Sequence, residues 1–557
     1  MKQKIQKIIL SAVKELYAEQ ADFSVDVPFD KNHGDYSSNV ALVLSKKIGK
    51  NPVETANIIK EKIGSNKLLE KTEVAGPGFI NFFVKDEVFI DNLKKIDEDF
   101  GRGTELKNQK IILDYTDPNP FKEFHIGHLM SNAIGESLSR IFEFEGAKVK
   151  RVCYQGDVGI HVAKAIWGKM QKPDYTWGMA YAFGSKIYEE SETSKKEMIE
   201  LNKTIYNRSD EKINKLYDEG KAESLKHFDE IYKILGTKFD YFIFESETGP
   251  LGKKIVEKGF KNKVFEEGDG GAVIFKGEKV GLHTRVFISS EGLPTYGAKD
   301  LALAEVKYKK YKYDKSVVVT AVEQDSHFEV MLAAMKETNP KLAEKTEHVG
   351  HGMLRLPEGK MSSRTGSVIT GESLILKTEE LILEKIKDRG FSETEKNDVA
   401  RKVAVGALKY SILKQSIGSD IIYDFDKSIS FEGDSGPYLQ YAYTRAYSVL
   451  EKAKKEGVKK SFSVQGGESL GWEITQLEKK MSYFPAVVIE ANKKKEPHII
   501  ALYLTELASE FNSYYAQNKI VDKTDKFSAY RVAVTNAFTI IMKNGLWMLG
   551  IETLNKM

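Results

Sequence analysis

The feature that most constrains the fold of this chain is a pair of strand–helix–strand patterns that lie far apart in the sequence. The first covers residues 111–154, where IILDY and VKRVCY are strand-like and a long apolar helical segment joins them. The second covers residues 315–356 and repeats the same order. Strands joined by a crossover helix pair in parallel. The chain is therefore predicted to be α/β, with one Rossmann-type parallel sheet split by an insertion at about 168–285.

The segments on either side of this sheet indicate two further domains, because a chain of 557 residues exceeds what one core supports. Residues 1–108 combine two helical patterns with the strand-like FINFFV and end in a charged, glycine-punctuated linker. Beyond about residue 385 the pattern is helical almost throughout. We expect a small α+β domain at 1–108, the parallel-sheet domain at 109–384 and an all-α domain at 385–557.

Composition excludes several classes of protein. The chain has 84 basic and 81 acidic residues, so a site for a polyanion must be a local patch. The single cysteine, Cys153, excludes an internal disulfide and a thiolate zinc cluster, as expected in a reducing cytosol. Lysines interrupt the apolar residues of 1–20, unlike a signal peptide, and apolar runs such as 316–322 are too short to span a membrane. These observations predict a cytoplasmic protein with no membrane partner.

Two histidines stand where the first strand gives way to its helix, in FKEFHIGH at 121–128. In a parallel sheet ligands bind at this junction, and the helix N-terminus there favours anions. His125 and His128 share one face of the first turn, and Gly127 lets a flat base or a phosphate approach the backbone. The motif suits a nucleoside triphosphate with charge developing on its α-phosphate. Taken alone, it could equally be two solvent-exposed polar residues in a loop.

A second motif, GKMSSRTGS at 359–367, follows the last strand of the second half. It places Lys360, two serine hydroxyls and Arg364 on a small-residue loop. A cationic loop rich in donors can close over a pyrophosphate leaving group. Its corresponding place in the second half favours a functional loop over a merely solvated one.

The two motifs together resemble the HIGH and KMSK signatures of class I aminoacyl-tRNA synthetases, and their flanks resemble the arginyl-tRNA synthetase family. DPNPFKEFHIGH carries the family's first signature, and YQGDVGIHVA at 154–163 is similar to its next loop. FEGDSGPYLQYAYTRA at 431–446 and the closing LGIETLNKM resemble its anticodon-binding domain. HGDYSSNVAL at 33–42 with EVAGPGFINFFV at 73–84 resembles its N-terminal, tRNA-elbow-binding domain.

This resemblance implies an arginine--tRNA ligase. Such an enzyme activates L-arginine with ATP to arginyl-adenylate and pyrophosphate, then transfers arginine to the 3′ end of tRNA(Arg). The implied partners are ATP, L-arginine and tRNA(Arg), with Mg²⁺ accompanying ATP and no dedicated metal site in the protein. We expect a monomer.

The resemblance also assigns the nucleotide site. It implies catalytic roles for Lys122, His125, His128 and Lys360, and ATP contacts from His125, Gly127, His128, Met353, Lys360, Met361, Ser362 and Ser363. Ser363 stands where the family's second KMSK lysine is expected. We hypothesise that Lys122 supplies the missing positive charge, although FKEF alone would also fit a surface lysine.

The arginine pocket is assigned in the same way. The residues implied are Asp114, Asp117, Asn119, His128, Tyr296, Asp300 and Gln324. Asp300 and Tyr296 would grip the guanidinium, while Asn119 and Gln324 would hold the amino and carboxylate end. The sequence departs from the family's pattern at three positions, with Asp114 for a common glutamate, Asp117 for a usual serine and Val158 for a usual tryptophan.

The C-terminal helices carry side chains suited to splayed anticodon bases. The candidates are Tyr438, Tyr441, Arg445, Asn512 and Tyr514, with Tyr515 beside them. Aromatic residues at helical spacing are more often part of a core, so one or two of these are expected to contact RNA.

Two other functions stay open at this stage. One is a HxGH nucleotidyltransferase that adenylates a small acid without RNA, against which the N-terminal module and the helical C-terminus count. The other is a non-catalytic, RNA-binding or amino-acid-sensing relative, which the altered KMSK loop favours. The retained Lys122, His125, Gly127, His128 and Lys360 argue against it.

Overall fold

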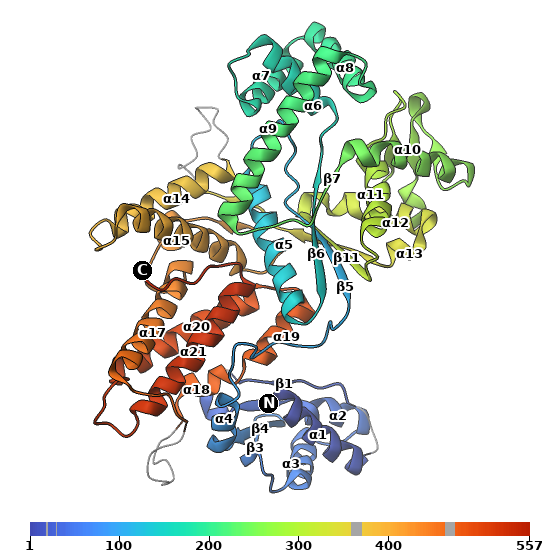
Figure 1. Cartoon of the computed structure of the whole chain (residues 1–557). Helices are drawn as coiled ribbons and strands as arrows, with labels where there is room; N and C mark the ends of the chain where they lie inside the picture. Colours follow the sequence, from blue (N-terminus) through green and yellow to red (C-terminus); the bar gives the residue numbers. More distant parts are fainter. Residues whose placement is uncertain (18–20, 29, 358–369, 463–473) are drawn as a thin grey trace.

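The central sheet determines the arrangement of the other parts (Figure 1). The computed structural model describes residues 1–17, 21–28, 30–357, 370–462 and 474–557. Five parallel strands run in the order β12-β11-β5-β6-β7. They are β5 (Lys110–Asp114), β6 (Lys148–Gln155), β7 (Tyr241–Phe244), β11 (Lys315–Ala321) and β12 (Thr346–His351).

The two predicted halves meet at the pair β5 and β11, where Val318 lies beside Asp114 in the register. From β5 the strand order runs outward through β6, and from β11 it runs outward through β12. Strand order therefore reverses between β5 and β11, and a crevice forms at such a point beyond the carboxyl ends of the strands. The predicted split parallel sheet is confirmed.

Helices cover both faces of this sheet. They are α5 (Ile126–Phe144), α10 (Glu245–Lys261), α11 (Tyr296–Lys310), α12 (Asp325–Thr338) and the short α13 (Pro340–Ala343). Helix α5 is apolar on most of its surface, because it is enclosed by the sheet and by helices α14, α15, α19 and α21 of the C-terminal region. A small antiparallel sheet packs beside α11, made of β8 (Glu266–Glu267), β9 (Val273–Phe275) and β10 (Arg285–Ile288).

The insertion is built mainly of helices. It forms α6 (Ile160–Gln171), α7 (Trp177–Glu190), α8 (Glu192–Asn207) and the long α9 (Glu211–Leu235), which stand above the sheet in Figure 1. Their inward faces bury a core of their own around Ile166, Trp177 and Ile205. Strand β7 also falls within the interval assigned to the insertion, although it pairs with β6 as an edge strand of the main sheet.

The N-terminal residues form a separate layer at the bottom of Figure 1. Its helices are α1 (Lys2–Tyr17), α2 (Val40–Ile48), α3 (Pro52–Ile63) and α4 (Asp86–Leu93). Its antiparallel sheet contains β1 (Val25–Asp26), β2 (Tyr36–Ser38), β3 (Leu69–Ala75) and β4 (Phe79–Val84). Lys479 of the C-terminal region contacts this layer by donating to Asp35 at 2.9 Å.

The C-terminal region is helical apart from the short pair β13 (Leu354–Arg355) and β14 (Ile421–Ile422). Its helices are α14 (Gly371–Ile386), α15 (Glu393–Leu413), α16 (Phe425–Ser428), α17 (Gly436–Glu456), α18 (Gln476–Met481), α19 (Phe484–Lys494), α20 (His498–Gln517) and α21 (Ser528–Met548). Within the described part of the chain, no helix is long and apolar enough to cross a membrane.

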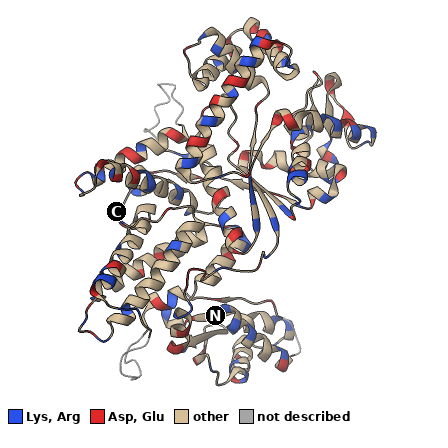
Figure 2. Ribbon diagram, in the orientation of Figure 1, with Lys and Arg blue, Asp and Glu red and all other residues tan. Residues whose placement is uncertain are grey.

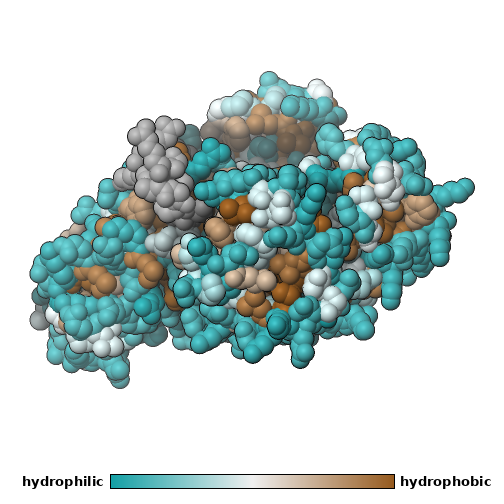
Figure 3. Space-filling model, turned by 90° about the horizontal axis from the view of Figure 1, so that it is seen from above, coloured by the Kyte–Doolittle hydropathy of each residue, from teal (hydrophilic) through white to brown (hydrophobic). Residues whose placement is uncertain are grey.

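In the view of Figure 2, acidic and basic residues are interspersed along the outer helices, and β6 carries Lys148, Lys150 and Arg151 in its first half. Seen from above, the surface is mainly hydrophilic, and hydrophobic side chains show chiefly in hollows between the lobes (Figure 3). The near balance of charge in the sequence is thus spread over the whole molecule.

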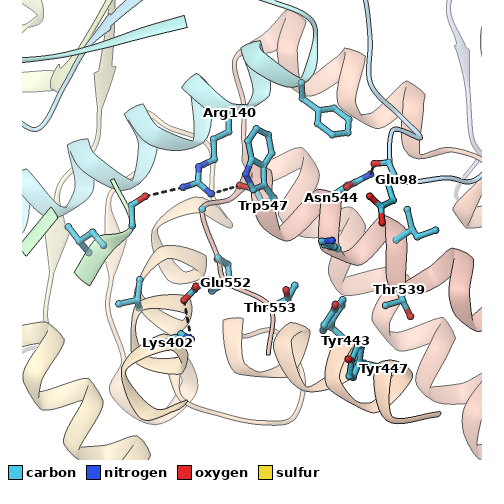
Figure 4. Close-up of a pocket in the computed structure, with 18 of the residues that line it drawn as sticks. Glu98, Arg140, Lys402, Tyr443, Tyr447, Thr539, Asn544, Trp547, Glu552 and Thr553 are labelled. Atoms are coloured by element: carbon cyan, nitrogen blue, oxygen red, sulfur yellow. Dashed lines mark hydrogen bonds and ion pairs between the residues drawn. The ribbon is translucent and has the colours of Figure 1, made fainter. Parts of the chain in front are cut away.

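A cavity of about 880 Å³ lies where α5 meets α15, α17, α21 and the C-terminal tail (Figure 4). Arg140 of α5 donates to the backbone oxygens of Trp547 and Gly236, at 3.0 and 3.1 Å. Lys409 of α15 is buried and donates to the backbone oxygens of Leu235 (2.6 Å) and Gly550 (2.8 Å). Arg140 thus connects the tail and the end of α9 to α5, and Lys409 connects them to α15.

Lys409 predicts a pH-dependent stability. Burial lowers its pKa to about 7, so between pH 7 and the ordinary lysine value the unfolded chain binds more protons than the folded one. The free energy of unfolding should therefore rise with pH over that interval, relative to that of Lys409→Met. Urea unfolding of both proteins from pH 7 to 10 measures the difference, and a difference independent of pH would contradict it.

Candidate active site at the carboxyl ends of the central strands

A cavity of about 420 Å³ opens at the carboxyl ends of β5 and β11, beside the N-terminus of α5. It lies at the crevice where the strand order reverses. The structure brings together there all seven residues predicted for the amino-acid pocket, with two from the nucleotide motif. These are Asp114, Asp117, Asn119, His125, Gly127, His128, Tyr296, Asp300 and Gln324.

The two histidines form the N-terminal cap of α5. His125 Nδ1 accepts from the backbone N–H of Gly127, and His128 Nδ1 accepts from the backbone N–H of His125, both at 3.1 Å. The rings stack with centroids 3.5 Å apart. Since each neutral ring uses Nδ1 as its acceptor, Nε2 carries the proton. The cap thus offers two N–H donors at a helix N-terminus, which suits an anionic oxygen.

Burial keeps these rings neutral. It lowers the pKa of His125 and lowers that of His128 much further, and the positive charge of nearby Lys122 acts in the same direction on both. A lowered pKa means that each ring stays neutral until the pH falls below the ordinary histidine range. The two Nε2 donors are therefore set in one tautomer at neutral pH.

The loop between β5 and α5 has an unusual backbone. Thr116, Asp117 and Phe121 all have positive φ, at 81°, 49° and 70°. Side chains hold this conformation: Ser131 Oγ accepts from the Thr116 N–H, and Ser224 Oγ accepts from the Phe121 N–H, both at 3.0 Å. Strain held by surrounding structure is common at functional sites.

One buried ion pair lies at the floor of the cavity. Lys307 Nζ contacts Asp114 Oδ2 at 3.0 Å, and both side chains are almost wholly buried. The second oxygen, Asp114 Oδ1, has no hydrogen-bond partner among the described residues. Burial raises the pKa of Asp114 despite Lys307, and burial together with the Asp114 charge raises the pKa of Asp117 much further. Of the two carboxyl groups, Asp117 therefore holds a proton more readily than Asp114.

Two further carboxyl groups line the cavity, each held by one neighbour. Glu245 Oε2 accepts from Lys299 Nζ at 2.5 Å, and both groups are buried. Asp300 Oδ2 contacts His327 Nε2 at 2.7 Å. The lining thus contains four carboxyl groups and a single lysine, Lys307. Such a lining suits a cation with several N–H donors.

Sequence reasoning missed Glu245, Lys307 and His327. Glu245 directly follows β7, so the rule that ligands gather at strand ends would have found it had 241–244 been recognised as a strand. Lys307 and His327 lie within helices, where the sequence offers no such signal.

Other predicted residues lie elsewhere. Lys122 is outside the cavity lining, and its Nζ lies 4.8 Å above the ring of Tyr181. Met353 is also outside it, with its N–H donating to Asp420. Lys360, Met361, Ser362 and Ser363 lie outside the described residues.

The backbone after residues 358–369 returns to the histidine motif. Thr370 forms a bridge with His125, and the N–H of Gly371 donates to the backbone oxygen of Phe124 at 2.7 Å. The end of the segment that carries the second motif therefore lies beside the first.

A second cavity, of about 560 Å³, lies among the C-terminal helices, and no Asp or Glu side chain lines it. Arg445 lies between the rings of Tyr441 and Tyr515, at 4.7 and 5.2 Å from their centroids, and donates to Asn512 Oδ1 at 2.6 Å. Asn512 in turn donates to the hydroxyl of Tyr438. Tyr514 is 4% exposed and does not line this cavity. Stacked aromatics with cations suit RNA bases and phosphates.

Comparisons with family models cover nearly the whole chain. Residues 93–425 match the model of tRNA synthetases class I (R), catalytic domain. Residues 439–557 match the DALR anticodon binding domain, and residues 3–84 match the arginyl tRNA synthetase N terminal domain.

Relatives and solved structures agree with these matches. The arginine--tRNA ligase of Fusobacterium nucleatum is 31% identical over 96% of this chain and 95% of its own length. That of Clostridium acetobutylicum is 30% identical over 100% of this chain and 99% of its own. The fold matches Thermus thermophilus arginyl-tRNA synthetase with a TM-score of 0.81 at 21% identity, over 100% of both chains.

Proposed function

This chain belongs to the arginyl-tRNA synthetase family, and from that premise we propose which of its residues carry each step of the reaction. It is an arginine--tRNA ligase, which joins L-arginine to ATP as arginyl-adenylate, releases pyrophosphate and transfers arginine to the 3′ end of tRNA(Arg). The nucleotidyltransferase that acts without RNA is excluded by this membership.

The observation that carries our assignment is the mixed lining of the cavity, which combines four carboxyl groups with two imidazole N–H donors at the N-terminus of α5. Asp300, Tyr296 and Glu245 take the guanidinium. Asn119 and Gln324 take the amino and carboxylate end; Asn119 Oδ1 already accepts from Gly156, which leaves its amide N–H groups to donate. Asp114 is already paired with Lys307. We therefore assign Asp114 and its neighbour Asp117 to the shape of the pocket and not to direct binding of the guanidinium.

The nucleotide occupies the end beside α5. His125 and His128 donate to its phosphate or ribose oxygens, Gly127 allows close approach, and Lys122 supplies positive charge at the α-phosphate. Lys360 and its neighbours in the second motif are proposed for the leaving pyrophosphate. Within the described ranges, no group of three or more His, Cys, Asp or Glu residues could hold a metal ion, so Mg²⁺ is proposed to arrive on the ATP phosphates.

The remaining assignments concern tRNA and the whole molecule. The cavity around Arg445, with Tyr441, Tyr515 and Asn512, is proposed to receive a base of the anticodon loop, and the buried Tyr514 leaves that set. Tyr438 supports this cavity by accepting a hydrogen bond from Asn512.

The domain boundaries at about residues 108 and 385, a monomeric state and a cytoplasmic location remain parts of the proposal. Light scattering of the purified protein tests the oligomeric state.

Exchange of labelled pyrophosphate into ATP tests activation directly. Reactions are run with and without total tRNA, and we expect exchange with arginine only, strongest when tRNA is present, and none with lysine or glutamate. The planar guanidinium matches the carboxyl pocket, whereas a lysine ammonium cannot make the same paired contacts. Absence of exchange in every reaction, with ATP still bound, would instead indicate a non-catalytic relative.

Asp300→Asn should raise the arginine KM about 10- to 100-fold, because it removes the charge from a hydrogen bond to the guanidinium. Steady-state exchange at varied arginine measures this. Asp229→Asn is the matched control, since Asp229 pairs only with Lys233 on the exposed side of α9. An unchanged KM in Asp300→Asn would remove Asp300 from the pocket.

Arg445→Lys should raise the KM for tRNA about 10-fold while the arginine KM at saturating tRNA stays unchanged. Lysine keeps the charge but loses the planar stack between two tyrosines. Aminoacylation at varied tRNA measures it, with Lys454→Ala, an exposed residue of α17 outside the cavity, as control. Equal effects on the KM for arginine and tRNA would argue against an anticodon contact.

A further inference from the structure

We propose that Tyr181, on helix α7 of the insertion, is a positioning residue that holds Lys122 for arginine activation. The inference rests on the proposed function, because it assumes that Lys122 supplies charge at the α-phosphate. It also gives the insertion a definite role in the reaction, since helices α7 and α9 shape the segment 121–123 that enters the histidine motif.

The contact between Lys122 and Tyr181 orients an ammonium without neutralising it. Lys122 Nζ lies 4.8 Å from the centre of the Tyr181 ring, within the range of a cation–π interaction. No carboxylate among the described residues forms an ion pair with Lys122. A carboxylate partner would cancel the charge that the phosphate needs, whereas a ring face fixes the ammonium and leaves the charge available.

The positive charge of Lys122 acts on histidines in and near the candidate active site. It contributes to the lowered pKa of both His125 and His128, and of His161, whose pKa falls to about 4. Burial is the larger cause at each ring, and Lys122 adds to it. The ammonium therefore lies close enough to act on an anion held at the same N-terminus of α5.

The residues on either side of Lys122 are fixed by the insertion as well. The ring of Phe121 packs edge-on against Trp177 with centroids 5.1 Å apart, and its backbone N–H donates to Ser224 of α9. A Cβ built on Gly178 would lie 1.7 Å from the Glu123 carboxylate, so α7 approaches the Glu123 side chain closely here. Phe121 holds φ of 70°, which needs such support.

A double-mutant cycle separates positioning from packing. The variants are Tyr181→Leu, Lys122→Ala and the two combined, with Tyr181→Phe to keep the ring. We expect Lys122→Ala to lower kcat for exchange about 100-fold or more. Tyr181→Leu should lower kcat about 10-fold with little change in arginine KM, and Tyr181→Phe, which keeps the ring but loses the hydroxyl that also contacts Lys122, should lose less.

The decisive result is the combined variant. If Tyr181 acts through Lys122, Tyr181→Leu causes no further loss once Lys122 is alanine. Equal losses in both backgrounds, or no loss in either, would overturn the proposal. If Lys122→Ala is as active as the wild type, the premise about Lys122 fails instead, and if the wild type shows no exchange, the proposed function itself fails.

Two further variants control for a general effect of losing an aromatic ring on α7 and for loss of folding. Tyr188→Leu is the matched control, because Tyr188 lies on the same helix and its ring takes Lys164 Nζ at 4.0 Å, while Lys164 has no proposed part in the reaction. It should leave kcat unchanged. Thermal melting checks folding, and if Tyr181→Leu unfolds, Tyr181→Met fills a similar volume without an aromatic face and is judged by the same criteria.

Discussion

The parallel pairing of β5 with β11 is the constraint on which the rest of the structure depends. It joins two halves of the sheet that are separated in sequence by the insertion and by helices α10 and α11. The pairing sets Asp114 beside Val318, and the carboxyl ends of both strands then open into one crevice. A shift of one residue in this register would turn Asp114 to the other face of the sheet. The substrate pocket is thus a product of one strand pair.

Three carboxyl groups of the cavity lining each contact a lysine or a histidine. Asp114 contacts Lys307, Glu245 contacts Lys299, and Asp300 contacts His327. An isolated buried carboxylate would take up a proton, whereas a partnered one can stay ionised and keep an oxygen for a ligand. Lys307 and His327 in the lining therefore help the carboxyl groups to stay ionised, although they would seem to oppose the cationic substrate proposed for this cavity.

Much of the fold could be predicted from the sequence, because strands leave local signals, whereas pocket residues such as Tyr296 and Asp300 were assigned through the family resemblance. The apolar runs that form β5, β6 and β11 stand out, and the polar residues after them were found at the cavity. The four-residue β7 was not recognised, and Glu245 was missed with it.

The rest depends on contacts between distant segments, which leave no local pattern. Lys307 is one of several lysines near the end of α11, and only the fold sets it against Asp114. Tyr181 and Lys122 likewise come from separate elements. Tyr514 had the spacing of an RNA contact, but it faces the core, as aromatics on helices commonly do.

The C-terminal tail buries Ile551 and Leu554 in the core, and its polar contacts run mainly through its backbone. Ser137, Arg140 and Lys409 donate to the carbonyls of Met548, Trp547 and Gly550, while Gln440 and Thr444 donate to those of Glu552 and Leu554. Every amino acid has a backbone carbonyl, so these hydrogen bonds depend on the position of a residue along the tail and not on its side chain. Evolution can exchange exposed tail residues freely, but adding or removing a single one would displace every anchor beyond it.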